Sequence, residues 1–456
     1  MKALYLKDII KNINAGCDYS GNAKVTGVST DTRTIKEGDL FIALAGDNFD
    51  GHSYVNVAVE KGAVAVVCSR QVNTTVPVLM VADTLSALQR IAAYYRSILD
   101  IKVVGITGSN GKTTTRDMTA RVLSSKYSVY STAKNFNNEI GLPKSVLELD
   151  DSYDIAVLEM GMNHLGEISR LTKIANPDVA AITNVGKAHI GNLGSQENIL
   201  KAKLEILEGL KPDGIVVLNG DNELLKDADT KDFEKKLISV SNKNAALYAK
   251  EILSLDGKTT FTVVNGKEET RGSIPVLGLY NVQNALEAMC IGLCFDVSIS
   301  DAFEALGGFE RVGMRSEAEE LNGITVVKDY YNASPDSSRV ALETLKDYAK
   351  GGRKFVIFGE MLELGDFGAK EHYRLGELCR ENEIDRAFFI GADFIQFKKG
   401  MPQNSEVFAA DKREALEEAL RRFVAEGGIK KGDAVLVKGS RGMKMEQFYE
   451  LLKTIL

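Results

Sequence analysis

The sequence feature most typical of phosphate chemistry is a glycine-rich turn that ends in lysine and threonine. The apolar run Val103–Ile106 leads into Thr107-Gly108-Ser109-Asn110-Gly111-Lys112-Thr113-Thr114, and a helix is expected to follow. Backbone N–H groups of such a turn and the N-terminus of the helix can converge on phosphate oxygens. The pattern predicts a nucleotide site at residues 108–114, with Lys112 reaching the β- and γ-phosphates and the Thr113 hydroxyl reaching Mg²⁺. Ile106 replaces the first glycine of the standard pattern, so the turn is a variant of the P-loop.

Two further strands are expected to end in residues that can bind a metal ion. Glu159 follows the apolar run Ile155–Leu158, and His189 follows the strand that ends near Thr183. The carboxyl ends of parallel strands form one edge of a sheet, where ligands bind in α/β proteins. We therefore expect Glu159 and His189 to lie on the same rim as the glycine-rich turn and to ligate Mg²⁺. For Glu159 alone, a helix-terminus or solvent contact is an equally good interpretation.

The composition is that of a soluble globular protein. Of 456 residues, 44 % are hydrophobic and 26 % are charged, which is enough chain for about three domains. The net charge of −7 and the absence of tryptophan argue against a nucleic-acid partner, which needs a basic face and favours stacking aromatics. No apolar run approaches the ~18 residues that span a bilayer, and no export signal is found, so a cytoplasmic location without membrane insertion is expected. The five scattered cysteines predict neither a disulfide framework nor a zinc site.

Three segments with different patterns of expected strands and helices divide the chain. Residues 1–98 combine short strand-like runs with one clear helix at 84–99, which predicts a small α/β unit. Residues 99–312 alternate strands and helices and predict a mostly parallel sheet covered on both faces, with a hairpin-like stretch at about 238–276. The alternation restarts in residues 313–456 and predicts a Rossmann-like unit. The predicted fold class is therefore α/β with three domains.

In their order and spacing, these motifs resemble those of the Mur ligases, a family of cytoplasmic ATP-dependent amide-bond ligases that build the peptide stem of peptidoglycan. The resemblance spans the whole chain and rests on Thr107–Thr114, Glu159, Asn184–His189, Ala202-Lys203 and Gly278–Ala285. Four other motifs are similar to those of the family member that joins D-alanyl-D-alanine to UDP-N-acetylmuramoyl-tripeptide: Ser29–Arg33, Asn135–Gly141, Asp329–Pro335, and Gly359–Gly365 with His372. The resemblance implies an N-terminal domain that binds the uridine nucleotide, a central P-loop-type ATPase domain and a C-terminal Rossmann-like domain. A monomer is expected.

The resemblance also implies roles for individual residues. Substrate contacts would come from Ser29, Asp31 and Arg33 to the uridine diphosphate, from Asn137 and Asn138 to the muramoyl-peptide, and from Asn332 in the C-terminal domain. ATP would be contacted by Asn281 at adenine and by Arg315 and Asp329 at the phosphates and ribose. Lys203, which alone would be interpreted as a surface lysine, would be carbamylated and would bind a second Mg²⁺ ion. The implied catalytic residues are Lys112, Glu159, His189, Lys203 and Arg315, and the implied metal ligands are Thr113, Glu159, His189 and Lys203.

The sequence departs from the family pattern at three positions. Tyr280 stands where histidine is frequent, Ser334 where asparagine is frequent, and Thr32 where serine is frequent. The third residue of the peptide stem, lysine or diaminopimelate, stays open.

Two other functions fit parts of the sequence. A sister ligase, either another Mur ligase or folylpolyglutamate synthetase, shares the same type of turn, but a folate ligase has no use for the segment 1–98. A nucleotide-switch protein of the GTPase kind needs a guanine-reading Asn-Lys-x-Asp, and only Asn242-Lys243-Asn244-Ala245 occurs. Turnover of ATP but not GTP, dependent on a uridine nucleotide, separates these alternatives from a Mur ligase.

Overall fold

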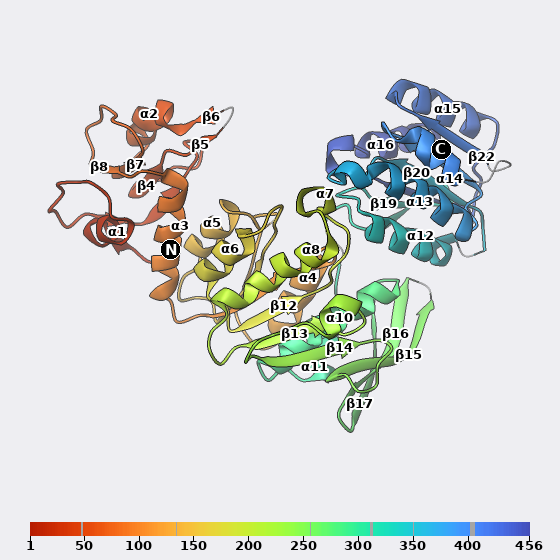
Figure 1. Ribbon diagram of the computed structural model, residues 1–456, viewed down its shortest axis with the longest axis horizontal. Coiled ribbons are helices and arrows are strands. Elements are labelled where there is room, and N and C mark those ends of the chain that lie inside the picture. Colours follow the sequence, from red (N-terminus) through yellow and green to blue (C-terminus); the bar gives the residue numbers. More distant parts are fainter. Residues whose placement is uncertain (47–48, 134, 256, 311–312, 350, 402–405) are drawn as a thin grey trace.

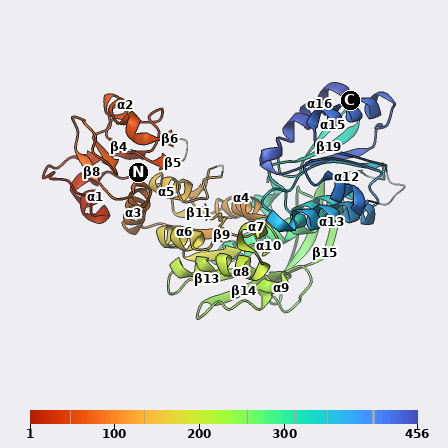
Figure 2. The ribbon, with the colours of Figure 1, turned by 45° about the horizontal axis from the view of Figure 1, so that its top comes forward.

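Three large sheets, each covered by helices, follow one another along the molecule in the order of the sequence (Figure 1). The structure is a computed structural model and describes residues 1–46, 49–133, 135–255, 257–310, 313–349, 351–401 and 406–456. The central unit lies between the other two, as the turned view also shows (Figure 2). None of the described helices is long and apolar enough to cross a bilayer.

The first unit is built on a parallel sheet with the strand order β3-β4-β7-β8. Its described elements are β1 (Leu4–Tyr5), α1 (Leu6–Ile13), β2 (Lys24–Val25), β3 (Gly27–Ser29), β4 (Asp39–Ile42), β5 (Ala45–Gly46), β6 (Phe49–Asp50), η1 (Gly51–Tyr54), α2 (Val55–Glu60), β7 (Ala65–Cys68), β8 (Val78–Met80) and α3 (Thr84–Ser97). The sequence predicted α3, which Asp83 caps by accepting hydrogen bonds from two backbone N–H groups of its first turn. It did not predict α1 or α2. Helix α1 was missed although its buried Leu6, Ile9 and Ile13 have helical spacing, and the six residues of α2 contain too few turns for a readable periodicity.

The central sheet has the order β10-β11-β9-β12-β13-β14-β15-β16-β17 among the described residues, and it is parallel from β10 to β15 and antiparallel beyond. Its strands are β9 (Lys102–Thr107), β10 (Val129–Ser131), β11 (Ile155–Glu159), β12 (Val179–Ile182), β13 (Ile215–Asn219), β14 (Glu234–Ser239), β15 (Leu247–Leu255), β16 (Lys258–Asn265) and β17 (Glu268–Ile274). Its helices are α4 (Lys112–Leu123), α5 (Gly141–Leu147), α6 (Glu167–Ala175), α7 (Ile190–Leu193), α8 (Gln196–Leu204), η2 (Glu205–Gly209), α9 (Glu223–Lys226), α10 (Leu279–Leu293) and α11 (Ile299–Gly307).

The two faces of the central sheet are covered by different helices. Successive side chains of a strand point to opposite faces, so Val103 joins the core beneath α3 and α6, while Val104 and Ile106 join the core beneath α4 and α10. Because α3 also packs against α5 and α6, the first unit is anchored to the central one by a shared apolar core. The helices cover the two faces of the sheet, so polar residues can lie at the edge formed by the carboxyl ends of the parallel strands.

The C-terminal sheet has the order β18-β19-β23-β20-β21-β22 among the described residues and is parallel except for β18. Its elements are β18 (Glu317–Leu321), β19 (Ile324–Asp329), α12 (Pro335–Ala349), β20 (Lys354–Gly359), η3 (Gly365–Phe367), α13 (Gly368–Glu381), β21 (Arg386–Ile390), α14 (Phe394–Gly400), β22 (Glu406–Ala410), α15 (Arg413–Ala425), β23 (Ala434–Lys438), η4 (Arg441–Met443) and α16 (Glu446–Ile455). Helices α12 and α13 cover one face, and α15 and α16 cover the other. The three-domain α/β fold and the Rossmann-like third unit are confirmed.

One of the two expected domain boundaries falls in a connecting segment that the structure describes. The boundary expected after residue 98 lies between α3 and β9. The boundary expected after residue 312 falls on residues 311–312, which lie outside the described residues. The boundaries 1–98, 99–312 and 313–456 stay a proposal.

Candidate active site

A cavity of about 520 Å³ lies where the carboxyl ends of the central strands face the C-terminal unit. This volume is in the range of small-molecule sites. The central unit contributes Asn110, Gly111, Lys112, Thr114, Asn137, Asn138, Glu159, His189 and Asn281 to its wall, and the C-terminal unit contributes Arg315, Asp329, Asn332 and Lys438. The cavity thus brings together most of the predicted nucleotide residues from two separate sheets.

The glycine-rich turn is held by the loop that follows β12. The φ of Gly108 is +150°, and a Cβ there would lie 1.9 Å from Thr183 Oγ1, so only glycine fits. The backbone N–H groups of Ser109 and Asn110 donate to Asn184 O and Asn184 Oδ1, both at 2.9 Å. Helix α4 begins directly after the turn, and the first N–H groups of a helix have no partner within it. Those N–H groups at the cavity wall are the natural phosphate donors.

Glu159, at the end of β11, lies at the centre of a network of donors. The residue is 2 % exposed. Thr113 Oγ1 donates to Glu159 Oε2 at 2.9 Å, Asn137 Nδ2 donates to Glu159 Oε1 at 2.7 Å, and Arg116 Nη1 lies 3.3 Å from Oε2. The interpretation of Glu159 as a solvent contact is therefore wrong. Asn137 also lines the cavity, and its predicted contact with the muramoyl-peptide stays a prediction.

The residues at this point fit a magnesium ion held together with a nucleotide. A hydroxyl and a carboxylate at hydrogen-bonding distance, Thr113 and Glu159, are hard oxygen donors of the kind Mg²⁺ takes. In the described part of the chain no three His, Cys, Asp or Glu side chains form a metal cluster. Because Mg²⁺ is usually held by one or two carboxylates plus phosphate oxygens and water, such a cluster is not required.

Lys112 lies over the glycine-rich turn and is partly buried at the cavity wall. Its Nζ donates to Gly108 O at 2.8 Å. Burial lowers the pKa of Lys112, and the nearby Arg315 lowers it further, whereas Glu159 raises it. A partly buried cation at the start of α4 is suited to migrating phosphoryl groups.

Lys203, in α8, is a buried lysine without a counter-charge in contact. Its side chain is 1 % exposed, and its Nζ has no hydrogen-bonding partner among the described residues. Burial and the charge of Lys112 hold the pKa of Lys203 well below its usual value. The interpretation as a surface lysine is wrong. Such an environment favours the neutral form of an amine, and a neutral amine is the nucleophile that CO₂ would need.

His189 lies at the border with the C-terminal unit. It is part of the cavity wall, and its Nδ1 lies 2.8 Å from Glu363 Oε2. Glu363 belongs to the Gly359–Gly365 motif, but no role was predicted for it.

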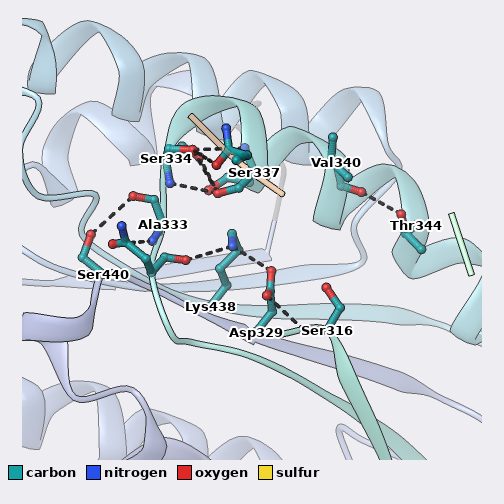
Figure 3. A network of polar contacts seen from close by, with 12 residues as sticks. Ser316, Asp329, Ala333, Ser334, Ser337, Val340, Thr344, Lys438 and Ser440 are labelled. Carbon is teal, nitrogen blue, oxygen red and sulfur yellow. Dashed lines mark hydrogen bonds and ion pairs between the residues drawn. The ribbon is translucent and has the colours of Figure 1, made fainter. Parts of the chain in front are cut away.

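The C-terminal side of the cavity is organised around an ion pair between Asp329, which was predicted, and Lys438, which was not (Figure 3). Lys438 Nζ lies 2.7 Å from Asp329 Oδ2 and donates to Asn332 O at 3.1 Å. Asp329 Oδ1 accepts from the backbone N–H of Ser316 at 3.0 Å. Lys438 ends the apolar strand β23, as Glu159 ends β11, so the strand-end rule that found Glu159 would also have found Lys438.

Arg315 and Asn281 line the cavity from different units. The Arg315 guanidinium lies 3.9 Å from the centre of the Tyr331 ring, a cation–π contact that fixes it above the site. Asn281 is 1 % exposed, and its Nδ2 donates to Leu277 O at 2.6 Å, at the start of α10. Its predicted adenine contact stays a prediction.

The predicted uridine residues lie away from this cavity. Ser29, Asp31 and Arg33 form a turn after β3, in which Ser29 Oγ donates to Asp31 O at 2.9 Å and Arg33 Nη2 lies 2.6 Å from Asp31 Oδ2. The hydrogen bonds from Arg33 lower the pKa of Asp31 to about 2. The Lys144 charge acts in the same direction from α5, and Asn138 Oδ1 accepts from Gly141 N at the start of that helix. The turn therefore faces the border between the first and central units.

The fold and site define a nucleotide-dependent enzyme whose phosphate pocket is shared by a P-loop-type sheet and a Rossmann-like unit. Residues 24–98 match the family model "Mur ligase family, catalytic domain", residues 106–292 "Mur ligase middle domain", and residues 310–441 "Mur ligase, glutamate ligase domain". The chain belongs to the Mur ligase family.

Relatives and solved structures match over nearly the whole chain. The UDP-N-acetylmuramoyl-tripeptide–D-alanyl-D-alanine ligase of Bacillus subtilis strain 168 is 39 % identical over 449 residues, which cover 97 % of this chain and 96 % of that protein. Crystal structure I of MurF from Acinetobacter baumannii has a TM-score of 0.93 at 29 % identity, covering 100 % of this chain and 99 % of that one. The structure of MurF ligase from Thermotoga maritima in complex with ADP has a TM-score of 0.84 at 28 % identity, covering 94 % of this chain and 97 % of that one.

Proposed function

We propose that this protein is an ATP-dependent ligase that joins D-alanyl-D-alanine to UDP-N-acetylmuramoyl-tripeptide in peptidoglycan precursor synthesis. The observation that carries the proposal is the cavity in which Lys112, Glu159 and Arg315 from two units converge, in a chain that matches such a ligase of Bacillus subtilis over 97 % of its length. ATP and a uridine nucleotide as substrates imply a reaction in the cytoplasm.

The reaction must turn a poor electrophile into a good one. The terminal carboxylate of the tripeptide attacks the γ-phosphorus of ATP, the bond to ADP breaks, and an acyl phosphate forms. The amine of D-alanyl-D-alanine then attacks the acyl carbon, and phosphate leaves with one oxygen of the original carboxylate. Lys112 and Arg315 offset the repulsion between the carboxylate and the phosphates, because fixed cations at developing negative charge lower the barrier.

Mg²⁺, when bound, would neutralise phosphate charge and polarise the transferred phosphoryl group. Thr113 and Glu159 would hold one ion, and His189 and Lys203 would serve a second. The buried, unpaired amine of Lys203 supports its conversion to a carbamate, whose anionic oxygen is a better Mg²⁺ ligand than an ammonium group.

The C-terminal unit would protect the intermediate. Ser334 Oγ donates to Asn110 Oδ1 at 3.0 Å, so α12 meets the glycine-rich turn directly. Water kept out of this border cannot hydrolyse the acyl phosphate. The Ser29–Arg33 turn would hold the uridine diphosphate at the other end of the substrate, with Asn138 and Asn332 contacting the peptide portion.

Phosphate release in the presence of ATP tests the proposal. UDP-muramoyl-tripeptide with lysine and UDP-muramoyl-tripeptide with diaminopimelate are each assayed with D-alanyl-D-alanine. Each assay is repeated with GTP in place of ATP. We expect release only when ATP, one tripeptide and the dipeptide are present together. Equal turnover of GTP would favour a nucleotide switch, and turnover with a folate and glutamate would favour folylpolyglutamate synthetase.

A further inference from the structure

A carboxylate of the C-terminal unit reaches the histidine of the central unit that we propose as a metal ligand. His189 Nδ1 lies 2.8 Å from Glu363 Oε2. The imidazole is mostly enclosed, with 16 % of its side chain exposed, whereas 47 % of the Glu363 side chain is exposed. In this orientation of the ring, the Nδ1 hydrogen does not point at the oxygen, so the two groups lie within ion-pair distance but make no hydrogen bond.

The backbones on both sides of this contact are shaped to make it. His189 and Glu363 both adopt left-handed conformations, with φ of +63° and +69°, which non-glycine residues rarely adopt. Gly191 N donates to Glu363 O at 3.1 Å, and a Cβ on Gly191 would lie 2.6 Å from Gly365 N. The two segments therefore approach too closely for a side chain at position 191, and this fixes the carboxylate beside the ring.

The same contact lies next to the proposed phosphate chemistry. His189 lines the cavity together with Lys112 and Glu159.

A carboxylate at one nitrogen of a histidine decides what the other nitrogen can do. When Nδ1 carries the proton that faces a carboxylate, Nε2 keeps its lone pair and can bind a metal. Such outer carboxylates orient metal-binding histidines in many proteins. Here the two partners belong to different units, so the arrangement exists only when the C-terminal unit is docked on the central one.

We infer that Glu363 is a positioning residue that sets the tautomer and orientation of His189, so that docking of the C-terminal unit completes the second Mg²⁺ site. This inference rests on the proposed function for the role of His189. The simpler alternative is that the pair only fastens the two units together, as Lys187 and Glu371 do at 2.7 Å.

The first experiment determines the tautomer of His189 by NMR and does not require the enzyme to turn over substrate. The chain has four histidines. In protein labelled with ¹⁵N-histidine, two-bond ¹⁵N–¹H correlations distinguish Nδ1–H from Nε2–H, and a His189→Gln variant assigns the signals. We expect Nδ1–H at His189 in the native protein and a shift toward Nε2–H in Glu363→Ala. Glu363→Gln, which keeps an oxygen acceptor, should retain Nδ1–H. An unchanged His189 signal in Glu363→Ala overturns the inference.

The second experiment measures metal affinity, with Mn²⁺ as the probe in the presence of a non-hydrolysable ATP analogue. We expect Glu363→Ala to weaken Mn²⁺ binding about 10-fold, the usual effect of losing an outer carboxylate. Glu371→Gln breaks the docking ion pair without touching His189, and Glu383→Ala removes a 91 % exposed glutamate that also has a positive φ. Both should bind Mn²⁺ as the native protein does.

An equal loss of Mn²⁺ affinity in Glu371→Gln would show that docking alone is responsible and would overturn the inference. Neither experiment uses the tripeptide or the dipeptide. Failure of the ligase assay would therefore leave these results intact, and failure here would leave the proposed reaction intact.

Discussion

Thr113 Oγ1 donates a 2.9 Å hydrogen bond to Glu159 Oε2, which links the first turn of α4 to the end of β11 across 46 residues of sequence. Strand β11 pairs directly with β9, the strand that leads into the glycine-rich turn. The register of these two parallel strands therefore decides that a hydroxyl and a carboxylate meet beside the cavity. The metal donors are fixed by the sheet before any ligand binds.

Replacing Lys112 should remove most of the activity and little of the stability. We expect Lys112→Ala to lower kcat by at least ~10²-fold, because one preorganised charge on the transferred phosphoryl group contributes about 3 kcal/mol. Steady-state phosphate release gives kcat, and thermal unfolding shows whether the fold is kept. Near-native kcat in a folded variant would remove Lys112 from the site.

Lys203 should be essential for activity, and a small carboxylate should replace part of its function. We expect Lys203→Ala to be nearly inactive and to be partly rescued by added formate or acetate, because a free carboxylate can take the place of the carbamate. Lys201→Ala is the matched control, since Lys201 lies on the same helix and is exposed. A fully active Lys203→Ala protein, or electron density of native protein that shows an unmodified Lys203, would contradict the carbamate.

A buried carboxyl group beneath the glycine-rich turn should make stability depend on pH. Glu287, in α10, is 1 % exposed and accepts a hydrogen bond from Thr115 Oγ1 at 3.3 Å. Burial raises the pKa of Glu287 to about 8 from an ordinary 4.5. The folded state therefore holds this proton more tightly than the unfolded state, so the contribution is present at low pH and is lost as the pH rises toward 8.

Glu287→Gln isolates this effect, because glutamine is neutral at every pH and nearly the same shape. We expect the free energy of unfolding of the native protein to fall relative to the variant by up to roughly 1.4 kcal/mol per pH unit between pH 5 and 8. Urea unfolding at pH 5, 6.5, 8 and 9 measures the difference. A difference that stays constant with pH would show that Glu287 is ionised in the folded protein.

The Lys438–Asp329 pair should matter both for stability and for activity. Lys438 is 1 % exposed, so Lys438→Met leaves a largely buried carboxylate without its cation and should cost roughly 3 kcal/mol of unfolding free energy. Adding Asp329→Asn should restore part of that stability but not the activity, since Asp329 lines the cavity. Urea unfolding and phosphate release on the same three proteins test this. If the double variant is no more stable than Lys438→Met, the pair is not what stabilises this edge.

Much of the fold could be predicted because its signals are local. The alternation of apolar strands with amphipathic helices predicts both large sheets, and the Gly-Lys-Thr turn follows β9 as expected. Short elements such as α5 and β18 were missed, because a few residues carry little periodicity and tertiary packing decides their conformation.

The site residues that directly follow an apolar strand could be predicted, whereas those that depend on the contact between two units could not. Glu159 follows an apolar strand, so its place on the rim could be inferred. The burial of Lys203 and the approach of Glu363 to His189 depend on packing between elements that are distant in sequence, and nothing local in either segment encodes it. The same holds for Asn137, which contacts Glu159 from a loop 22 residues earlier.

The central claim is that ATP activates the carboxylate of the tripeptide as an acyl phosphate, and an isotope follows that atom directly. The terminal carboxylate of the tripeptide is labelled with ¹⁸O at both oxygens, and the phosphate released with ATP and D-alanyl-D-alanine is analysed by mass spectrometry. An acyl phosphate transfers one carboxylate oxygen to phosphate, so each released phosphate should contain a single ¹⁸O. Phosphate free of ¹⁸O, released at the rate at which the amide forms, would contradict the account.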